Sequence, residues 1–189
     1  MDKGVFEVED TMTIEENLGY SFSEKNLLNR ALTRKAYALE QEQRNQDCED
    51  QEIFRTLGDA VLKAVLVDLL IKSGCKTREE ITSKKKELER KESLARISQG
   101  LRIGHFIKLG AGEKKQKANE EPYVLAETLE ALIGAIYLDG EYEASKNVIT
   151  KWFKNFFAYL FFPEDLDSFL EKRMESIVNT VKEKVRLLE

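Results

Sequence analysis

The chain has 189 residues, of which 42% are hydrophobic and 34% charged, and its formal net charge is −5. This composition is typical of a soluble globular domain that buries its own core, and it excludes a disordered chain. Only 2 prolines and 10 glycines are present, which favours uninterrupted helices over a fold of many short strands. The net charge does not exclude a nucleic-acid partner, because an acidic protein can still carry local basic patches.

The cysteines and the N-terminus indicate where such a protein works. Cys48 and Cys75 form no CxxC pair, which is typical of reduced thiols in a cytosolic protein. Residues 1–13 lack the apolar run of a secretory signal and are interpreted as a tail. No stretch approaches the roughly 20 apolar residues that a membrane span needs. We therefore expect a cytoplasmic protein without a membrane span.

The first predicted helices lie within residues 14–33, where apolar residues recur at helical spacing. The pattern predicts a short helix, a turn at Gly19 and Tyr20, and a second helix with Ser23 as its N-cap. The polar stretch 38–52 has no such periodicity, which is typical of an exposed helix end or a loop.

A strongly apolar helix is expected next, at residues 52–73, with Gly74 in the usual position after a helix C-terminus. The charged segment 77–101 carries leucine and isoleucine at helical spacing and predicts one amphipathic helix. The glycine- and lysine-rich segment 104–121 predicts a loop.

Helices account for the rest of the chain. Pro122 suits the first position of a helix that covers 124–139 and ends near Asp139, and another helix is expected at 141–162. From Pro163 onward a single apolar stripe predicts a terminal amphipathic helix. The sequence thus predicts an all-α protein, with one domain at residues 14–157 and a helical extension at residues 158–189.

Two acids stand inside the apolar segment 124–139, where they are costly. A helix that is apolar nearly all round is normally buried, and Glu127 and Glu130, three residues apart, share one of its faces. An ionised carboxylate in a low-dielectric interior is strongly unfavourable unless a cation compensates it. Two such carboxylates also repel each other, so the pair predicts a cation between them.

The first apolar helix carries a second acidic position. Asp59 lies between Gly58 and Ala60, two small residues that allow another backbone or a ligand to approach closely. Arg55 and Glu52 precede Asp59 by four and seven residues, which places all three on one helix face.

Residue spacing leaves two interpretations of these charges open. In the first, Arg55 bridges Asp59 and the two glutamates in a buried ion-pair cluster that has no chemical role. In the second, the acids bind a metal ion, and the absence of histidine and cysteine from the set favours Mg²⁺ or Mn²⁺ over zinc. The spacing alone does not decide between them.

The same segments resemble the ribonuclease III family. The sequence EIFRTLGDA at 52–60 is similar to that family's signature helix, ExLEFLGDA, and LAETLEALIGAIYLD at 125–139 is similar to its second motif, LADxxEALIGAIYLD. Shorter matches are LGY at 18–20, LL at 27–28, ALT at 31–33, ESLA at 92–95 and LGAGE at 109–113. The resemblance extends over residues 14–157, most of the chain.

The resemblance implies an all-helical endonuclease domain of the ribonuclease III type that forms a homodimer and hydrolyses phosphodiester bonds in double-stranded RNA. Mg²⁺, with Mn²⁺ as a substitute, would activate the attacking water and stabilise the leaving oxygen. By residue-to-residue match, Asp59 and Glu130 are the expected essential metal ligands. Glu127 is a third, one methylene longer than the family's aspartate, and Glu52 matches the signature's first glutamate.

Arg55 departs from the family pattern, which has a glutamate facing the metal at that position. Arginine cannot act as a ligand and brings a permanent positive charge. It could pair with a carboxylate that the metal needs, or turn outward to an RNA phosphate. The competing hypothesis is therefore a catalytically impaired dimer that binds structured RNA or a ribonucleoprotein partner. A third hypothesis is an interaction protein whose terminal stripe docks a partner helix.

The basic clusters are candidate contacts with RNA. The extension at 158–189 is too short for a separate double-stranded-RNA-binding domain, so we expect the nuclease dimer itself to hold the duplex. Such clusters are more often solvated surface than binding sites, and the alternative stays open. The candidates are Lys84, Lys85, Lys86, Arg90, Lys91, Lys114, Lys115 and Lys117.

Overall fold

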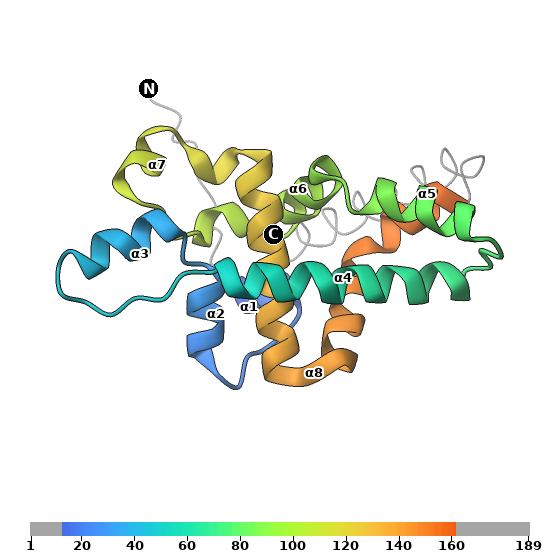
Figure 1. Ribbon diagram of the computed structural model, residues 1–189, viewed down its shortest axis with the longest axis horizontal. Helices are drawn as coiled ribbons and strands as arrows, with labels where there is room; N and C mark the ends of the chain where they lie inside the picture. Colours follow the sequence, from blue (N-terminus) through green and yellow to red (C-terminus); the bar gives the residue numbers. More distant parts are fainter. Residues whose placement is uncertain (1–12, 162–189) are drawn as a thin grey trace, which may run out of the picture. The chain divides into compact units, whose positions relative to one another are not determined.

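The computed structural model describes residues 13–161 (Figure 1). Nearly all of the predicted N-terminal tail and the whole predicted helix after Pro163 lie outside these residues. The chain divides into two compact units, Met1–Trp152 and Phe153–Glu189, and the candidate site lies within the first. Within the described range the secondary structure is helical, as expected, and no helix there is long and apolar enough to cross a membrane.

Three short helices open the first unit: α1 (Ile14–Leu18), α2 (Lys25–Ala31) and α3 (Lys35–Glu42). The predicted turn after α1 is confirmed, with Gly19 in the left-handed conformation at a φ of 67°. The prediction that Ser23 caps α2 is wrong: Glu24 is the N-cap, and the Ser23 N–H donates to the carboxylate of Asp139. α3 covers the start of the polar stretch, so the expectation of an exposed helix end is the correct alternative there.

The middle of the unit contains α4 (Glu52–Lys72), α5 (Arg78–Leu88) and α6 (Lys91–Gly100). The prediction for α4 is confirmed, including a glycine after its end, Gly74 at a φ of 97°. The prediction of a single helix at 77–101 is wrong, because the backbone of Arg90, with a φ of −59° and a ψ of 143°, is not helical and separates α5 from α6.

The glycine- and lysine-rich segment that was expected to be a loop contains three short helices: η1 (Ile103–Phe106), α7 (Ala111–Lys115) and η2 (Ala118–Glu120). The two 3-10 helices, η1 and η2, pack closely because Gly104 lies directly against the backbone of Asn119, a contact that no side chain would allow.

The last helix, α8 (Pro122–Phe161), begins at the predicted proline. It is interrupted at Gly140, with a φ of −138°, and at Glu141, with a φ of 60°. The break follows Asp139 directly, where the sequence predicted that one helix ends and another begins. The first part of α8 is therefore a separate helical segment, and it contains both Glu127 and Glu130.

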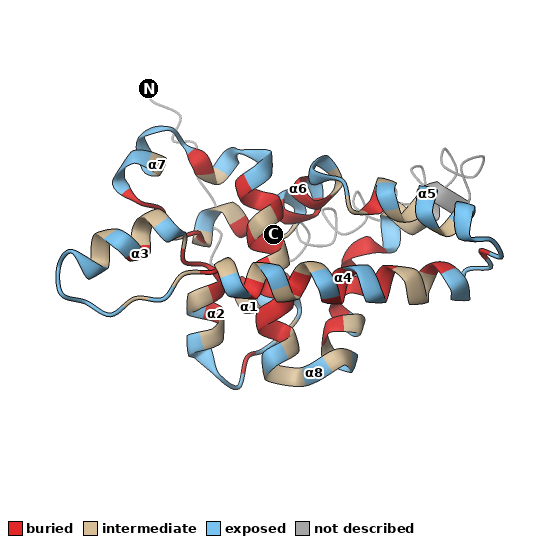
Figure 2. Cartoon of the chain, in the orientation of Figure 1, coloured by how far each residue is buried: buried red, intermediate tan, exposed pale blue. Residues whose placement is uncertain are grey.

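The first part of α8 crosses α4 at two glycines. A Cβ atom built on Gly58 would lie 2.8 Å from the backbone nitrogen of Gly134, and one on Gly134 would lie 3.1 Å from that of Gly58. The two backbones therefore touch, as the small residues beside Asp59 predicted. Figure 2 shows the buried faces of both helices at this crossing, and Leu62, Leu129 and Ile133 are fully buried.

Candidate functional site

The glycine crossing determines where the predicted acids lie. The carbonyl group of Glu130 packs directly against Gly58, so the next residue of α4, Asp59, is held close to Glu130. Glu127 lies just under one turn before Glu130 on α8 and faces Arg55, which lies just over one turn before Asp59 on α4. The structure thus brings together the acids that the sequence singled out on the two helices.

Glu130 is the most perturbed acid of the site. Burial raises the pKa of its carboxyl to about 7, and the negative charges of Asp59 and Glu127 add to this effect, while Arg55 and Lys63 oppose it. The nearby cations therefore compensate this carboxylate only in part. A partly buried acid with a raised pKa beside other acids is a common property of functional sites.

Asp59 is paired within its own helix. The Nζ atom of Lys63 lies 2.7 Å from the Oδ2 atom of Asp59, one turn along α4. The hydrogen bond to Asp59 raises the pKa of Lys63, and the charges of Glu89 and Glu130 act in the same direction. Lys63 is therefore held among three acids as a cation.

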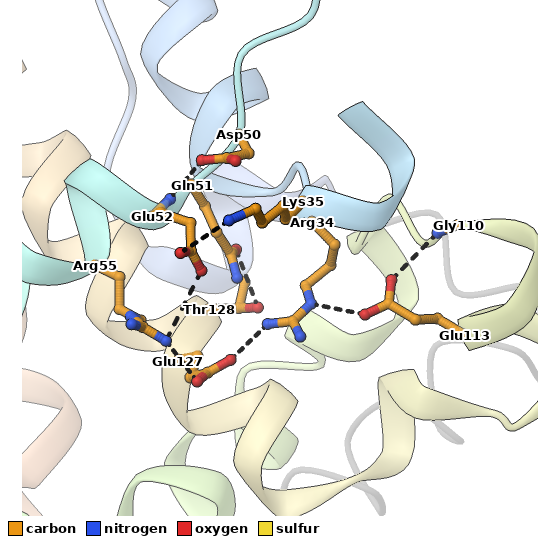
Figure 3. Close-up of polar contacts among 10 residues, drawn as sticks. All are labelled: Arg34, Lys35, Asp50, Gln51, Glu52, Arg55, Gly110, Glu113, Glu127 and Thr128. Atoms are coloured by element: carbon orange, nitrogen blue, oxygen red, sulfur yellow. Dashed lines mark hydrogen bonds and ion pairs between the residues drawn. The ribbon is translucent and has the colours of Figure 1, made fainter. Parts of the chain in front are cut away.

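Glu127 accepts hydrogen bonds from two arginines, one at each oxygen (Figure 3). The Nη1 atom of Arg34 lies 2.6 Å from Oε2, and the Nη1 atom of Arg55 lies 2.6 Å from Oε1. Hydrogen bonds between two ionised groups are the strongest that side chains form. Arg55 therefore points into the acidic cluster rather than outward.

The contacts continue on both sides of Glu127 as a chain of alternating charges. Arg34 also reaches Glu113, with an Nε–Oε1 distance of 3.2 Å. Arg55 lies 4.0 Å from Glu52, and Lys35 lies 3.9 Å from the same carboxylate. Acids and bases alternate along this chain of contacts, which can be followed in Figure 3, and the formal charges of its members sum to zero: Glu113, Arg34, Glu127, Arg55, Glu52 and Lys35.

Arg34 is one of three basic site residues that sequence reasoning missed, with Lys35 and Lys63. It precedes α3, and its backbone N–H donates to the carbonyl of Lys108 at 3.1 Å, beside the isolated bridge between Thr33 and Lys108. These backbone contacts fix the starting point of the side chain. Arg34 and Glu127 are 93 residues apart in sequence, and no local pattern connects them.

The donor set does not fit a divalent cation in this arrangement. Among residues 13–161, no group of three or more histidine, cysteine, aspartate or glutamate side chains is placed to hold a metal ion. Both oxygens of Glu127 are bound to guanidinium groups, and one oxygen of Asp59 is bound to Lys63. The geometry thus favours an ion-pair cluster. The metal-ligand roles of Asp59, Glu127 and Glu130 stay predictions.

The basic clusters differ in their surroundings. Lys85 pairs with Glu89 and Arg90 with Glu87, each at 2.7 Å, so part of the positive charge along α5 is already used. Lys86 and Lys91 are exposed, as are the three lysines of the α7 region, Lys114, Lys115 and Lys117.

The fold and the site define the class of this protein as an all-helical domain in which carboxylates gather at a glycine-mediated helix crossing. The family model described as "Ribonuclease-III-like" matches residues 24–156. The chain belongs to the ribonuclease III family.

Curated relatives and solved structures agree with this assignment. The chain is 36% identical over 143 residues to Ribonuclease 3 of Pseudothermotoga lettingae and 35% identical over 140 residues to that of Pseudomonas fluorescens. These matches cover 75% and 74% of this chain but only 60% and 57% of the relatives, so the chain spans well under two thirds of their length.

The structural match is to an isolated domain. The nuclease domain of ribonuclease III from Campylobacter jejuni superposes with a TM-score of 0.68 at 31% identity, over 78% of this chain and 97% of that one. A second structure of that domain, described for flexibility in the region involved in dimer formation, gives the same TM-score at 30% identity, over 75% and 94% of the two chains.

Proposed function

We propose that this chain binds double-stranded RNA as a homodimer and that its hydrolysis of phosphodiester bonds is strongly impaired. The carrying observation is the 2.6 Å contact between Arg55 Nη1 and Glu127 Oε1, which places a permanent cation among the acids that would hold Mg²⁺. The family assignment supports RNA as the partner. The free thiols of Cys48 and Cys75 accord with a cytoplasmic location.

The exposed lysines of α7 are the best-placed contacts with RNA phosphates. Lys114 and Lys115 follow Glu113, whose carboxylate is bound to Arg34 and so to the acidic cluster. Glu40 of α3 accepts a hydrogen bond from the backbone of Ala111 at 2.6 Å and holds the start of α7. Because an A-form duplex is bound mainly through its shape and phosphates, we expect binding without sequence preference.

The outer face of α4 supports self-association. Apolar residues recur along it at spacings of three and four, and the end members are strongly exposed, Ile53 at 67% and Ile71 at 55%. Between them lie Leu57, Ala60, Ala64 and Val67. Such a stripe on a long helix is self-complementary, because a second copy can pack the same stripe against it. A region involved in dimer formation is described for the Campylobacter jejuni nuclease domain, which supports self-association of this chain without locating the interface.

The first experiment separates binding from cleavage. A long RNA duplex is incubated with the native chain in EDTA for a gel shift and in Mg²⁺ or Mn²⁺ for cleavage. Ribonuclease 3 of Pseudomonas fluorescens serves as the active control. We expect a shift that weakens steeply with salt, a reduction of about 4 in the salt slope for Lys114→Ala with Lys115→Ala, because each protomer loses two contacts, and cleavage at least about 100-fold slower than the control.

A metal-dependent endonuclease is the second candidate. The raised pKa of Glu130, about 7, favours this function, because a divalent cation would relieve the repulsion between the carboxylates of Glu130 and Asp59. Asp59, Glu127 and Glu130 would then hold Mg²⁺, or Mn²⁺ in its place. Rapid metal-dependent cleavage by the native chain that disappears in Asp59→Asn would establish this function and refute the first. A chain that ignores duplex RNA altogether would refute both.

A further inference from the structure

The two arginines at Glu127 match a divalent cation in charge. Each guanidinium carries one positive charge at every accessible pH, and each occupies a different oxygen of the same carboxylate, at 2.6 Å. A Mg²⁺ ion bound to Glu127 at about 2.0–2.1 Å would therefore lie beside two guanidinium charges that repel it. Arg55 and Arg34 come from different segments, and either one alone keeps a positive charge at this carboxylate.

We infer that Arg34 and Arg55 together replace the divalent cation at Glu127, so that changing Arg55 alone restores only part of the site's affinity for metal. The inference concerns the same site as the proposed function, and it rests on that proposal only for the assignment of the acids. It adds a second residue, Arg34, that nothing in either family motif singles out.

Arg34 is the more firmly held member of the pair. Its side chain is 14% exposed, whereas that of Arg55 is 33% exposed. Burial by itself would lower the pKa of the Arg34 guanidinium, but the hydrogen bonds to Glu127 and Glu113 more than offset this effect, so its pKa is raised and its charge is secure. Its backbone is held by the bridge between Thr33 and Lys108 and by its own N–H bond to the Lys108 carbonyl, neither of which involves residue 55. A change at residue 55 therefore leaves Arg34 in place.

Metal binding without RNA tests the inference directly. Isothermal titration with Mn²⁺ is performed on the full native chain, Arg34→Gln, Arg55→Glu and the double variant, with Arg96→Gln on α6 as an exposed charge-matched control. We expect no saturable binding by the native chain or the control. We expect the double variant to bind Mn²⁺ at least about tenfold more tightly than Arg55→Glu, the scale on which neighbours of a metal ligand change affinity.

Two outcomes of the titration would overturn the inference: Arg55→Glu binding as tightly as the double variant, or the native chain binding saturably. Because the double variant leaves Glu127 without partners and could fail to fold, the isosteric Glu127→Gln is tested by thermal unfolding. We expect Mn²⁺ to leave the Tm of both the native chain and Glu127→Gln unchanged. A Mn²⁺-dependent rise in the native Tm that Glu127→Gln lacks would overturn the inference whatever the RNA assays show.

Discussion

The glycine crossing of α4 and α8 is the part of the fold most sensitive to a single methyl group. In Gly58→Ala the added Cβ would lie 2.7 Å from the carbonyl carbon of Glu130 and 2.8 Å from the nitrogen of Gly134, and it would overlap the carbonyl oxygen of Glu130. Ordinary van der Waals contact begins at 3.4 Å, so the carbon contact alone requires the helices to separate by about 0.7 Å. Both neighbours are backbone atoms, which cannot rotate away as a side chain would.

We expect Gly58→Ala to lower the free energy of unfolding by about 3 kcal/mol, the upper part of the range for overpacking in a rigid core. For a domain of this size that corresponds to a fall in Tm of about 6–12 °C. Gly112→Ala is the matched control, because a Cβ on Gly112 has no neighbour within 4 Å, and it should leave the Tm unchanged or slightly raised. Thermal unfolding by circular dichroism measures both. A Gly58→Ala protein that melts within about 2 °C of the native chain would refute the close crossing.

Three further predictions concern charge and association. The pKa of Glu130 is raised from 4.5 to about 7 in the folded protein, so its ionisation lowers the stability as pH rises between these values. The free energy of unfolding of Glu130→Gln should therefore rise by about 1–2 kcal/mol relative to the native chain between pH 5 and pH 8, a figure reduced for solvent at a partly buried group. Urea unfolding that shows no such rise would contradict this prediction. The pKa of Asp139 is lowered, because hydrogen bonds from the Glu24 and Ser23 backbones and the Tyr20 hydroxyl outweigh its burial. The carboxylate therefore stabilises the folded protein above the unfolded pKa, and this stabilisation is lost as pH falls through the folded pKa. Asp139→Asn should cost about 1–3 kcal/mol at pH 7, a difference that shrinks below about pH 4; a pH-independent difference would mean that the charge is irrelevant. Finally, Ile53→Glu with Ile71→Glu should shift the chain from dimer to monomer in sedimentation velocity, whereas Leu39→Glu, at a residue of α3 that is 48% exposed, should not.

The long helices were predictable because their signals are local. The apolar run of α4 and the proline that opens α8 are properties of neighbouring residues, and the structure confirms both. The errors lie where tertiary contacts decide. Ser23 has the right side chain for a cap, but its backbone N–H is taken by Asp139, 116 residues later. The charged segment 77–101 reads as one helix, yet Arg90 breaks it.

The candidate site divides in the same way. Acids within apolar helices are visible in sequence because they are costly there, and the crossing at Gly58 brings Asp59 and Glu130 together as expected. The partners of those acids were harder to foresee. One interpretation of the sequence had Arg55 bridging Asp59 and the two glutamates; Arg55 does pair with Glu127, but Asp59 pairs with Lys63. Helix spacing gives the face on which a long side chain lies, but not which of several nearby carboxylates it reaches.

The hydrogen bonds at Asp139 also fix the position of the first part of α8 along its axis. The carboxylate of Asp139 accepts hydrogen bonds from the backbone N–H groups of Ser23 and Glu24, just before α2, and the helical conformation is interrupted at the next residue, Gly140. Sliding a helix by one residue moves it about 1.5 Å and turns it by about 100°. Glu127 lies 12 residues before Asp139, about 18 Å along the helix axis. The position of Glu127 relative to α4 is therefore set by contacts at the other end of this helical segment. The contacts of Asp139 with Ser23 and Glu24 thus hold Glu127 and Glu130 in register with α4, although neither glutamate touches these residues.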